Sequence, residues 1–265
     1  MTPEELLRLY DQQLRAEAEV ADADEVTAIG PVLAAIFPAR GRGFATARPI
    51  PAGTDVEALV AEVAAHFQSD PRVSNAEWKT RGHDGTLGLL DALARHGFRL
   101  EEVETIMAGD IDAVIAAESP IPVHYSLHRA DTPALIREAE ALAGRVFGDS
   151  PEDSARRADE LVERDRRWPG SFEMWCVRDA RGEIVCSGRV DPVPGSDFAG
   201  LWGGACAPEH RGLGLYRALT AARARSARER GVRFLQSDCS PMSRPILERA
   251  GLVPITTTTP AVWRR

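Results

Sequence analysis

Two hydrophobic periodicities run along this chain and divide it into helices and strands. Apolar residues three or four positions apart predict amphipathic helices near residues 3–20, 55–68, 133–146, 151–166, 213–230 and 242–250. Short apolar or alternating runs predict strands near residues 123–127, 172–177, 184–190, 200–206, 233–237 and 252–258. Since strands and helices alternate, the pattern predicts an α/β fold built on a mixed sheet.

Helix starts share a local signature, in which Ser or Thr precedes a proline. The hydroxyl can cap a free amide, and the missing N–H of proline costs nothing in the first helical turn. The four examples are Thr2-Pro3, Thr132-Pro133, Ser150-Pro151 and Ser240-Pro241. Two segments, Thr2 to Glu5 and Thr54 to Glu57, also fit the capping box.

One junction carries the strongest chemical signal. Residues 208–217 (PEHRGLGLYR) join a strand that ends in small residues to the helix expected near 213–230. Gly212 and Gly214 allow the backbone to approach a ligand closely. The free amides and the positive dipole end of the helix attract an anion. The junction therefore predicts a phosphate-binding loop.

These residues resemble the acyl-CoA-binding motif of the GCN5-related N-acetyltransferases (GNAT), which is Gln or Arg, two residues, Gly, one residue, then Gly or Ala. Arg211 and Gly214 match this motif, and Tyr216 departs from it at the last position. The order strand, loop, helix, strand, short helix, Gly-Leu, strand supports the resemblance across residues 120–265. It implies a mostly antiparallel central sheet flanked by helices.

The resemblance also implies a function, an N-acetyltransferase in which an amine attacks the thioester of acetyl-CoA directly. The backbone of the small-residue strand would pair with the pantetheine arm, the loop amides would hold the diphosphate, and Ser240 would open the short helix. The implied cofactor-binding residues are Gly204, Ala205, Cys206, Arg211, Gly212, Leu213, Gly214, Leu215, Tyr216 and Ser240. No metal is implied.

Catalytic candidates lie where the acceptor would sit in such a fold. Glu173 and Asp238 are candidate bases, each with an ordinary ion pair as the alternative. Cys239 is a candidate proton donor, with Tyr216, water or departure of the thiolate without a donor as the alternatives. The usual donor of the family is a Tyr at the position that Leu247 occupies here. A noncatalytic acyl-CoA sensor or scaffold is therefore the alternative function.

Arginines gather along the long helix and just beyond its end. We expect a solvated face here, and a contact of one of them with the 3'-phosphate of CoA is the alternative. The residues are Arg217, Arg223, Arg225, Arg228, Arg230 and Arg233.

The first half holds a second literal match to the motif at residues 40–45 (RGRGFA), but the prolines at 49 and 51 prevent a following helix. A strand is expected there instead. Residues 55–110 echo the second half, with a strand near 76–79 and a helix that closes at Gly97. We therefore expect a tandem arrangement, a degenerate GNAT-like domain at 1–118 and the acyl-CoA-binding domain at 119–265, with residues 112–121 as the linker.

Charge and composition argue against several other classes of protein. Residues 1–120 carry a net charge of −11 and residues 121–265 a net charge of +3, which argues against nonspecific nucleic-acid binding. No apolar run suits a membrane span, and the acidic start does not fit a signal peptide, so we expect a cytoplasmic protein. The four cysteines form no CxxC pair, so the sequence indicates neither a zinc site nor a disulfide framework, and we expect them to be core residues. The expected partner is an amine on a small molecule or a peptide; the acceptor and the oligomeric state stay open.

Overall fold

The computed structural model describes residues 1–265 as two compact units that interleave along the chain. The first unit comprises Met1–Met107, Asp238–Arg244 and Pro254–Arg265, and the second comprises Ala108–Ser237 and Pro245–Val253. The last residues of the chain therefore pack with the first ones. No helix is both long enough and apolar enough to span a lipid bilayer.

The first unit is built on a six-stranded sheet in the order β1-β2-β3-β4-β13-β5. Neighbouring strands are antiparallel except for the parallel pair β3 and β4. Its strands are β1 Glu25–Ile29, β2 Val32–Phe37, β3 Arg42–Ala47, β4 Asn75–Lys79, β5 Arg99–Leu100 and β13 Pro260–Arg264. Its helices are α1 Pro3–Gln13, α2 Val56–Ser69 and α3 Leu89–Arg95, with short 3₁₀ turns at Ala16–Ala18, Pro38–Arg40 and Gly82–Asp84.

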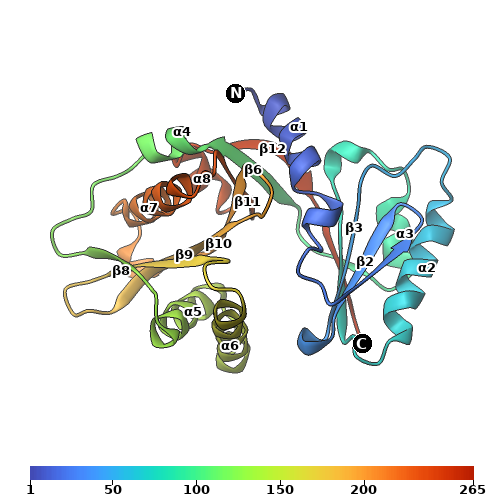
Figure 1. The fold of residues 1–265 in the computed structure, drawn as a ribbon, viewed down its shortest axis with the longest axis horizontal. Coiled ribbons are helices and arrows are strands. Elements are labelled where there is room, and N and C mark those ends of the chain that lie inside the picture. The colour runs from blue at the N-terminus through green and yellow to red at the C-terminus, as the bar shows by residue number, and fades with distance from the viewer. The chain divides into compact units, whose positions relative to one another are not determined.

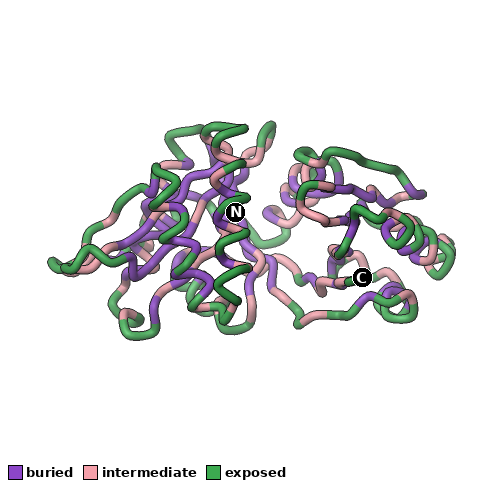
Figure 2. The backbone as a smooth tube through the Cα atoms, turned by 90° about the horizontal axis from the view of Figure 1, so that it is seen from below, coloured by how far each residue is buried: buried purple, intermediate pink, exposed green.

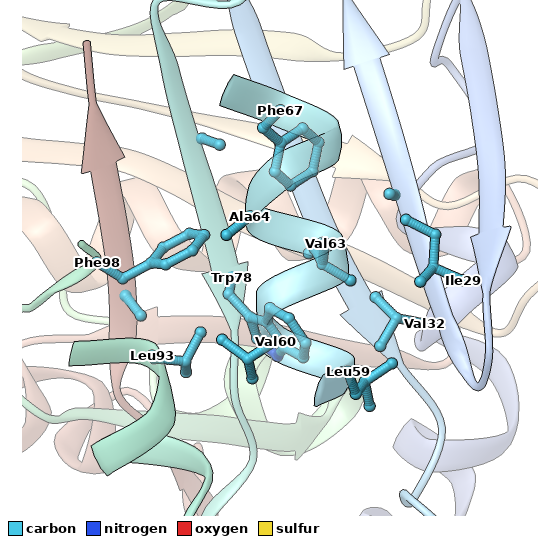
Figure 3. Packing of buried hydrophobic residues seen from close by; sticks show 14 of the residues in the cluster. Ile29, Val32, Leu59, Val60, Val63, Ala64, Phe67, Trp78, Leu93 and Phe98 are labelled. Atoms are coloured by element: carbon cyan, nitrogen blue, oxygen red, sulfur yellow. The ribbon is translucent and has the colours of Figure 1, made fainter. Parts of the chain in front are cut away.

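Apolar side chains of α2 and α3 fill one face of this sheet (Figure 3). Phe67 and Val63 project from α2 and Leu93 from α3 into the same apolar cluster as the indole of Trp78 on β4. Each of these side chains is almost wholly buried. At about 25 cal/mol per Å² of buried apolar surface, such a cluster supplies a large share of the stability of the unit.

The second sheet has seven strands in the order β12-β6-β11-β10-β9-β8-β7. Helix α7 packs on one face and α5 on the other, with α6 against α5 (Figure 1). The strands are β6 Glu104–Asp110, β7 Ser126–Arg129, β8 Glu173–Arg178, β9 Ile184–Pro192, β10 Phe198–Cys206, β11 Phe234–Cys239 and β12 Val253–Thr258. The helices are α4 Ile111–Ala116, α5 Pro133–Phe147, α6 Pro151–Arg167, α7 Leu215–Glu229 and α8 Arg244–Arg249, with a 3₁₀ turn at Pro208–His210.

The two mostly antiparallel sheets flanked by helices confirm the predicted fold class. Buried positions run along the strands and the inner helix faces, while the turns are exposed (Figure 2). The strand expected at the literal motif match is present as β3. The linker prediction for 112–121 was wrong in its first part, because Asp110 caps the helix α4 there. The strand expected at 123–127 begins only at Ser126, since the preceding residues form a turn.

Three of the four predicted Ser/Thr caps are confirmed in detail. The side chains of Thr2, Thr132 and Ser150 each accept from the amide three residues ahead. The predicted capping box at Thr54 was wrong, because the carboxylate of Asp55 caps α2 instead and accepts from the amide of Ala58 at 3.0 Å. A carboxylate cap is stabilised further by its attraction to the positive end of the helix dipole, and an uncharged hydroxyl lacks this attraction.

This correction gives a direct stability test. We expect Asp55→Ala to lower the free energy of unfolding by about 1 kcal/mol, since an orphan amide loses its acceptor. Thr54→Ala is the matched control and is expected to change stability by less than about 0.5 kcal/mol, because its exposed hydroxyl only donates to the carbonyl of Pro51. Urea unfolding of the two variants decides, and a larger loss in Thr54→Ala would contradict the assignment.

Candidate functional site

The candidate site begins where two parallel strands separate. β10 pairs with β11 only from Phe198–Gly200, opposite Phe234–Gln236. β10 then continues to Cys206 against β9 alone, with a bulge between Trp202 and Ala205. At the residue after Gly200, the hydroxyl of Ser237 donates a hydrogen bond to the carbonyl of Leu201 at 3.0 Å. Beyond that point β10 no longer pairs with β11, and an unpaired strand edge is where an extended chain can add by backbone hydrogen bonds.

The predicted phosphate loop lies at the end of β10. The 3₁₀ turn Pro208–His210 and an extended Arg211 lead to Gly212 and Gly214, whose φ angles are 78° and 80°. Both angles are in the left-handed region, which glycine adopts without a steric penalty. Gly214 is the N-cap residue of α7, so the amides of Leu215 and the next residues have no intrahelical partner. The loop therefore has the expected strand, glycine loop and helix order.

Two side-chain contacts fix the conformation of this loop. The guanidinium Nε of Arg211 donates to the carbonyl of Cys206 at 3.1 Å, across the turn. The hydroxyl of Tyr125 lies 2.9 Å from Nδ1 of His210, with the two rings edge to face. The loop is thus held before any ligand arrives, which lowers the entropy cost of binding.

Tyr216, in the first turn of α7, packs its side chain in an apolar cluster with Leu215 and Leu219. Its hydroxyl lies so close to β10 that a Cβ built on Gly204 would come within 2.2 Å of it. Glycine at position 204 therefore makes room for the phenol ring. The guanidinium of Arg223 lies 5.6 Å from the ring centroid.

Ser119 is a residue of this site that the sequence analysis did not single out. It is buried, and its Oγ would lie 2.2 Å from a Cβ built on Gly214. Arg217 on α7 donates to the same oxygen at 3.4 Å. The bidentate pair of Glu118 with Arg225 fixes the neighbouring backbone. No local pattern predicts this contact, because Ser119 and Gly214 are far apart in sequence.

The solvated arginine face predicted for α7 was wrong for Arg223, which is fully buried. Its guanidinium donates to the carbonyl of Arg189 at 3.1 Å and to the hydroxyl of Thr220 at 3.0 Å. Through its hydrogen bond to the carbonyl of Arg189 on β9, Arg223 joins α7 to the sheet. Other arginines of this set are exposed, as predicted. Arg228, for example, forms a surface ion pair with Asp112 at 2.8 Å.

The two candidate bases lie in different surroundings. Glu173 is buried on β8, where the hydroxyl of Ser226 and the indole of Trp175 donate to it, and two arginines lie within 4 Å. Asp238 lies at the carboxyl end of β11 and pairs with Lys79 at 2.5 Å. Glu173 is thus held by α7, whereas Asp238 belongs to a charged cluster of the first unit.

That charged cluster comprises Lys79, Asp238, Glu19, Arg81 and Tyr10, all buried or nearly so. Arg81 donates to Glu19 at 2.6 Å and to the hydroxyl of Tyr10 at 2.9 Å. Burial raises the pKa of Tyr10 to about 12. Burial opposes the charged form of Lys79, but Asp238, Tyr10 and Glu19 outweigh it and raise the pKa of that ammonium. At neutral pH Tyr10 therefore keeps its phenol proton, and the ammonium of Lys79 keeps its charge.

A neighbouring carboxyl, Glu104 on β6, has the opposite shift. Burial raises its pKa, and the negative charge of Asp238 raises it further. A carboxyl with a raised pKa beside a candidate base is a typical feature of acid–base sites, though structural ion pairs show it too. No sequence pattern distinguishes Glu104, because it is one of three glutamates within four residues.

The remaining candidates lie at the end of β11 and on α8. Cys239 is buried, and the hydroxyl of Ser240 accepts from the amide of Ser243 at 3.4 Å, in the turn before α8. Leu247 is also buried, with 2% of its surface exposed, so its side chain packs in the core. No group of three or more His, Cys, Asp or Glu side chains is placed to hold a metal ion.

Residues 137–250 match the model of the acetyltransferase (GNAT) family. The match spans α5 through α8 and so includes the separated strands and the glycine loop. No curated protein matches the chain.

Solved structures resemble the whole chain at low sequence identity. A GCN5-related N-acetyltransferase from Kribbella flavida has a TM-score of 0.70 at 15% identity, over 98% of this chain and 95% of that one. A tandem GNAT protein from the clavulanic acid biosynthesis pathway has a TM-score of 0.60 at 16% identity, over 88% and 78%. A GCN5-related N-acetyltransferase-like protein from Streptococcus suis has a TM-score of 0.58 at 13% identity, over 99% and 98%. At such identities, the likeness establishes the fold.

Proposed function

Because residues 137–250 match the model of the acetyltransferase (GNAT) family, we propose that the chain transfers an acetyl group from acetyl-CoA to an amine. The observation that carries this proposal is the separation of β10 from β11 beside the glycine loop at the start of α7. An open strand edge suits the amide-bearing pantetheine arm, and a row of free helix amides suits a diphosphate.

The energetics of this loop are adequate for coenzyme binding. Hydrogen bonds to a charged group contribute about 1.5 to 3 kcal/mol each. Three or four amides from Arg211 to Tyr216 would thus supply most of the ~8 kcal/mol of a micromolar complex. Main-chain groups make these bonds, so having Tyr216 where the family motif has Gly or Ala does not remove them. The ring of Tyr216 packs in the apolar cluster with Leu215 and Leu219.

In the proposed reaction, the residues of the chain orient the reactants and move protons. Acetyl-CoA supplies the activated acyl group, and the backbone edge of β10 aligns its thioester. Asp238 takes the proton of the acceptor ammonium, which frees the lone pair of the nitrogen for attack. Cys239, next to it on β11, is the proposed proton donor to the departing thiolate.

Calorimetric titration with acetyl-CoA tests the binding step, and thiol release with a panel of amines tests the transfer. We expect saturable binding in the micromolar range and thiol release with at least one amine. No heat at high protein concentration would refute the proposal.

A pair of carboxamide variants tests which carboxylate acts as the base. We expect Asp238→Asn to lower kcat by about 100-fold, within the usual range for losing a general base, when assayed at a temperature where this variant, which also loses the anionic partner of Lys79, is still folded. Glu173→Gln is the matched control; we expect it to lower thermal stability while kcat changes little, because Ser226 and Trp175 engage this carboxylate in the core. The reverse pattern would transfer the role to Glu173.

A noncatalytic acyl-CoA sensor is the second candidate function. The observation that favours it is Leu247, an apolar core side chain at the position where the family usually has a tyrosine donor. Binding of acetyl-CoA without thiol release across a broad amine panel would favour the sensor over the enzyme.

A further inference from the structure

Two of the four cysteines face one another across neighbouring strands. Cys186 on β9 and Cys206 on β10 are direct partners in the antiparallel register. The next pair of residues along the strands is hydrogen-bonded, since the amide of Ala207 donates to the carbonyl of Val185 at 2.9 Å. Hydrogen-bonded and non-hydrogen-bonded pairs alternate, so the cysteines form a non-hydrogen-bonded pair, whose Cα atoms lie about 4.5 Å apart.

That spacing is compatible with a disulfide, which joins Cα atoms roughly 4.4 to 6.8 Å apart. Both side chains point to the same face of the sheet, toward the cluster of Leu215 and Leu219 under α7. Neither cysteine is in a disulfide in this structure. The geometry needs little backbone movement to close the bond.

The two thiols differ in exposure and in acidity. Cys186 is fully buried, whereas Cys206 is partly exposed at the base of the glycine loop. A hydrogen bond from Cys186 lowers the pKa of Cys206, and the charge of Arg211 lowers it further, although burial opposes both effects. Since the thiolate is the reactive form, Cys206 is the thiol that an oxidant meets first.

We propose that Cys206 and Cys186 are a redox modification site, which closes to a cross-strand disulfide on exposure to a peroxide. The sulfur of Cys206 attacks one peroxide oxygen, so an S–O bond forms, the O–O bond breaks and water leaves with the thiol proton. The sulfur of Cys186 then attacks the sulfur of Cys206, the S–O bond breaks and a second water leaves. Two thiols are oxidised by two electrons, and hydrogen peroxide is reduced to water.

The other cysteines do not fit this role. Cys176 on β8 packs with Ile136 and Ala139 of α5, on the opposite face of the sheet. Cys239 lies on β11, which pairs with β10 only as far as Gln236. The arrangement therefore specifies one disulfide among the six possible pairs of four cysteines.

Peptide mapping of the oxidised full chain tests the site without reference to the acetyltransferase proposal. The reduced protein is treated with hydrogen peroxide, alkylated in denaturant and digested with trypsin. Cleavage after Arg181, Arg189 and Arg211 places Cys186 in peptide 182–189 and Cys206 in peptide 190–211. We expect these two peptides to be joined, with a loss of two hydrogen atoms, and to separate after reduction.

Two variants sharpen the result. Cys176→Ser is the matched control and should leave the joined peptides at the wild-type yield. Cys186→Ser should abolish the link and leave a sulfenic acid on Cys206 that dimedone captures. The proposal is overturned if wild-type peptides 182–189 and 190–211 stay separate while thiols are consumed, or if another pair is joined. It is also overturned if the folded chain keeps all four thiols under peroxide that oxidises the unfolded chain.

Discussion

Gly214→Glu is expected to abolish measurable binding of acetyl-CoA. A side chain here meets Ser119, and a carboxylate at the N-terminus of α7 occupies the place proposed for the diphosphate. Loss of only two charged hydrogen bonds would cost about 3 kcal/mol or more, which is a factor of at least ~100 in Kd. Calorimetric titration of the purified variant measures this change.

Two further glutamate variants separate the loss of binding from a loss of folding. Gly212→Glu adds the same charge where a Cβ has open space, so we expect weak binding without a clash. Gly148→Glu places glutamate at another left-handed glycine, the C-cap residue of α5, also with open space around it. It should lower stability similarly to Gly212→Glu and leave Kd unchanged. Wild-type Kd in both loop variants would contradict the proposed diphosphate site.

Lys79→Met is expected to lower the free energy of unfolding by about 3 to 5 kcal/mol. The reason is that Asp238 loses its cation while it stays buried, and an uncompensated buried charge is strongly destabilising. For a chain of this size, such a loss corresponds to a decrease in Tm of roughly 10 °C. Thermal and urea unfolding, followed by tryptophan fluorescence, provide the measurement.

Arg72→Met is the matched control for this substitution. Arg72 also forms ion pairs, with Glu25 and Asp70, but it is exposed, and exposed pairs contribute about 0 to 1 kcal/mol. The double variant Lys79→Met/Asp238→Leu removes both charges, and we expect it to be more stable than Lys79→Met alone. Equal losses in Lys79→Met and Arg72→Met would show that burial does not set the strength of the Lys79 pair.

Local sequence signals were sufficient where the structure depends on local chemistry. The Thr-Pro and Ser-Pro starts led to α1, α5 and α6, because a cap and a preset φ angle act within one helical turn. The glycine loop and α7 followed from the same kind of reasoning. The strands β8 to β12 were found from short apolar runs between turn residues.

The sequence could not show features that depend on distant contacts. β1 is mostly exposed and β2 mostly buried, so neither has the alternation that identifies a half-buried strand. The burial of Arg223 depends on the carbonyl of Arg189, which lies on another element. The C-terminal strand β13 lies between β4 and β5, and sequence order gives no hint of that position. The degenerate copy at 1–118 and the site roles stay predictions.

The chain carries a single lysine, and the charged cluster holds it in the interior. All its other side-chain cations, histidines aside, are guanidinium groups, which keep their proton at neutral pH and so are not nucleophiles. The side chains of these residues therefore offer an acetyl donor almost no amine to modify. In an assay of the proposed transfer with isotopically labelled acetyl-CoA, we therefore expect minimal incorporation of label into the side chains of the protein itself.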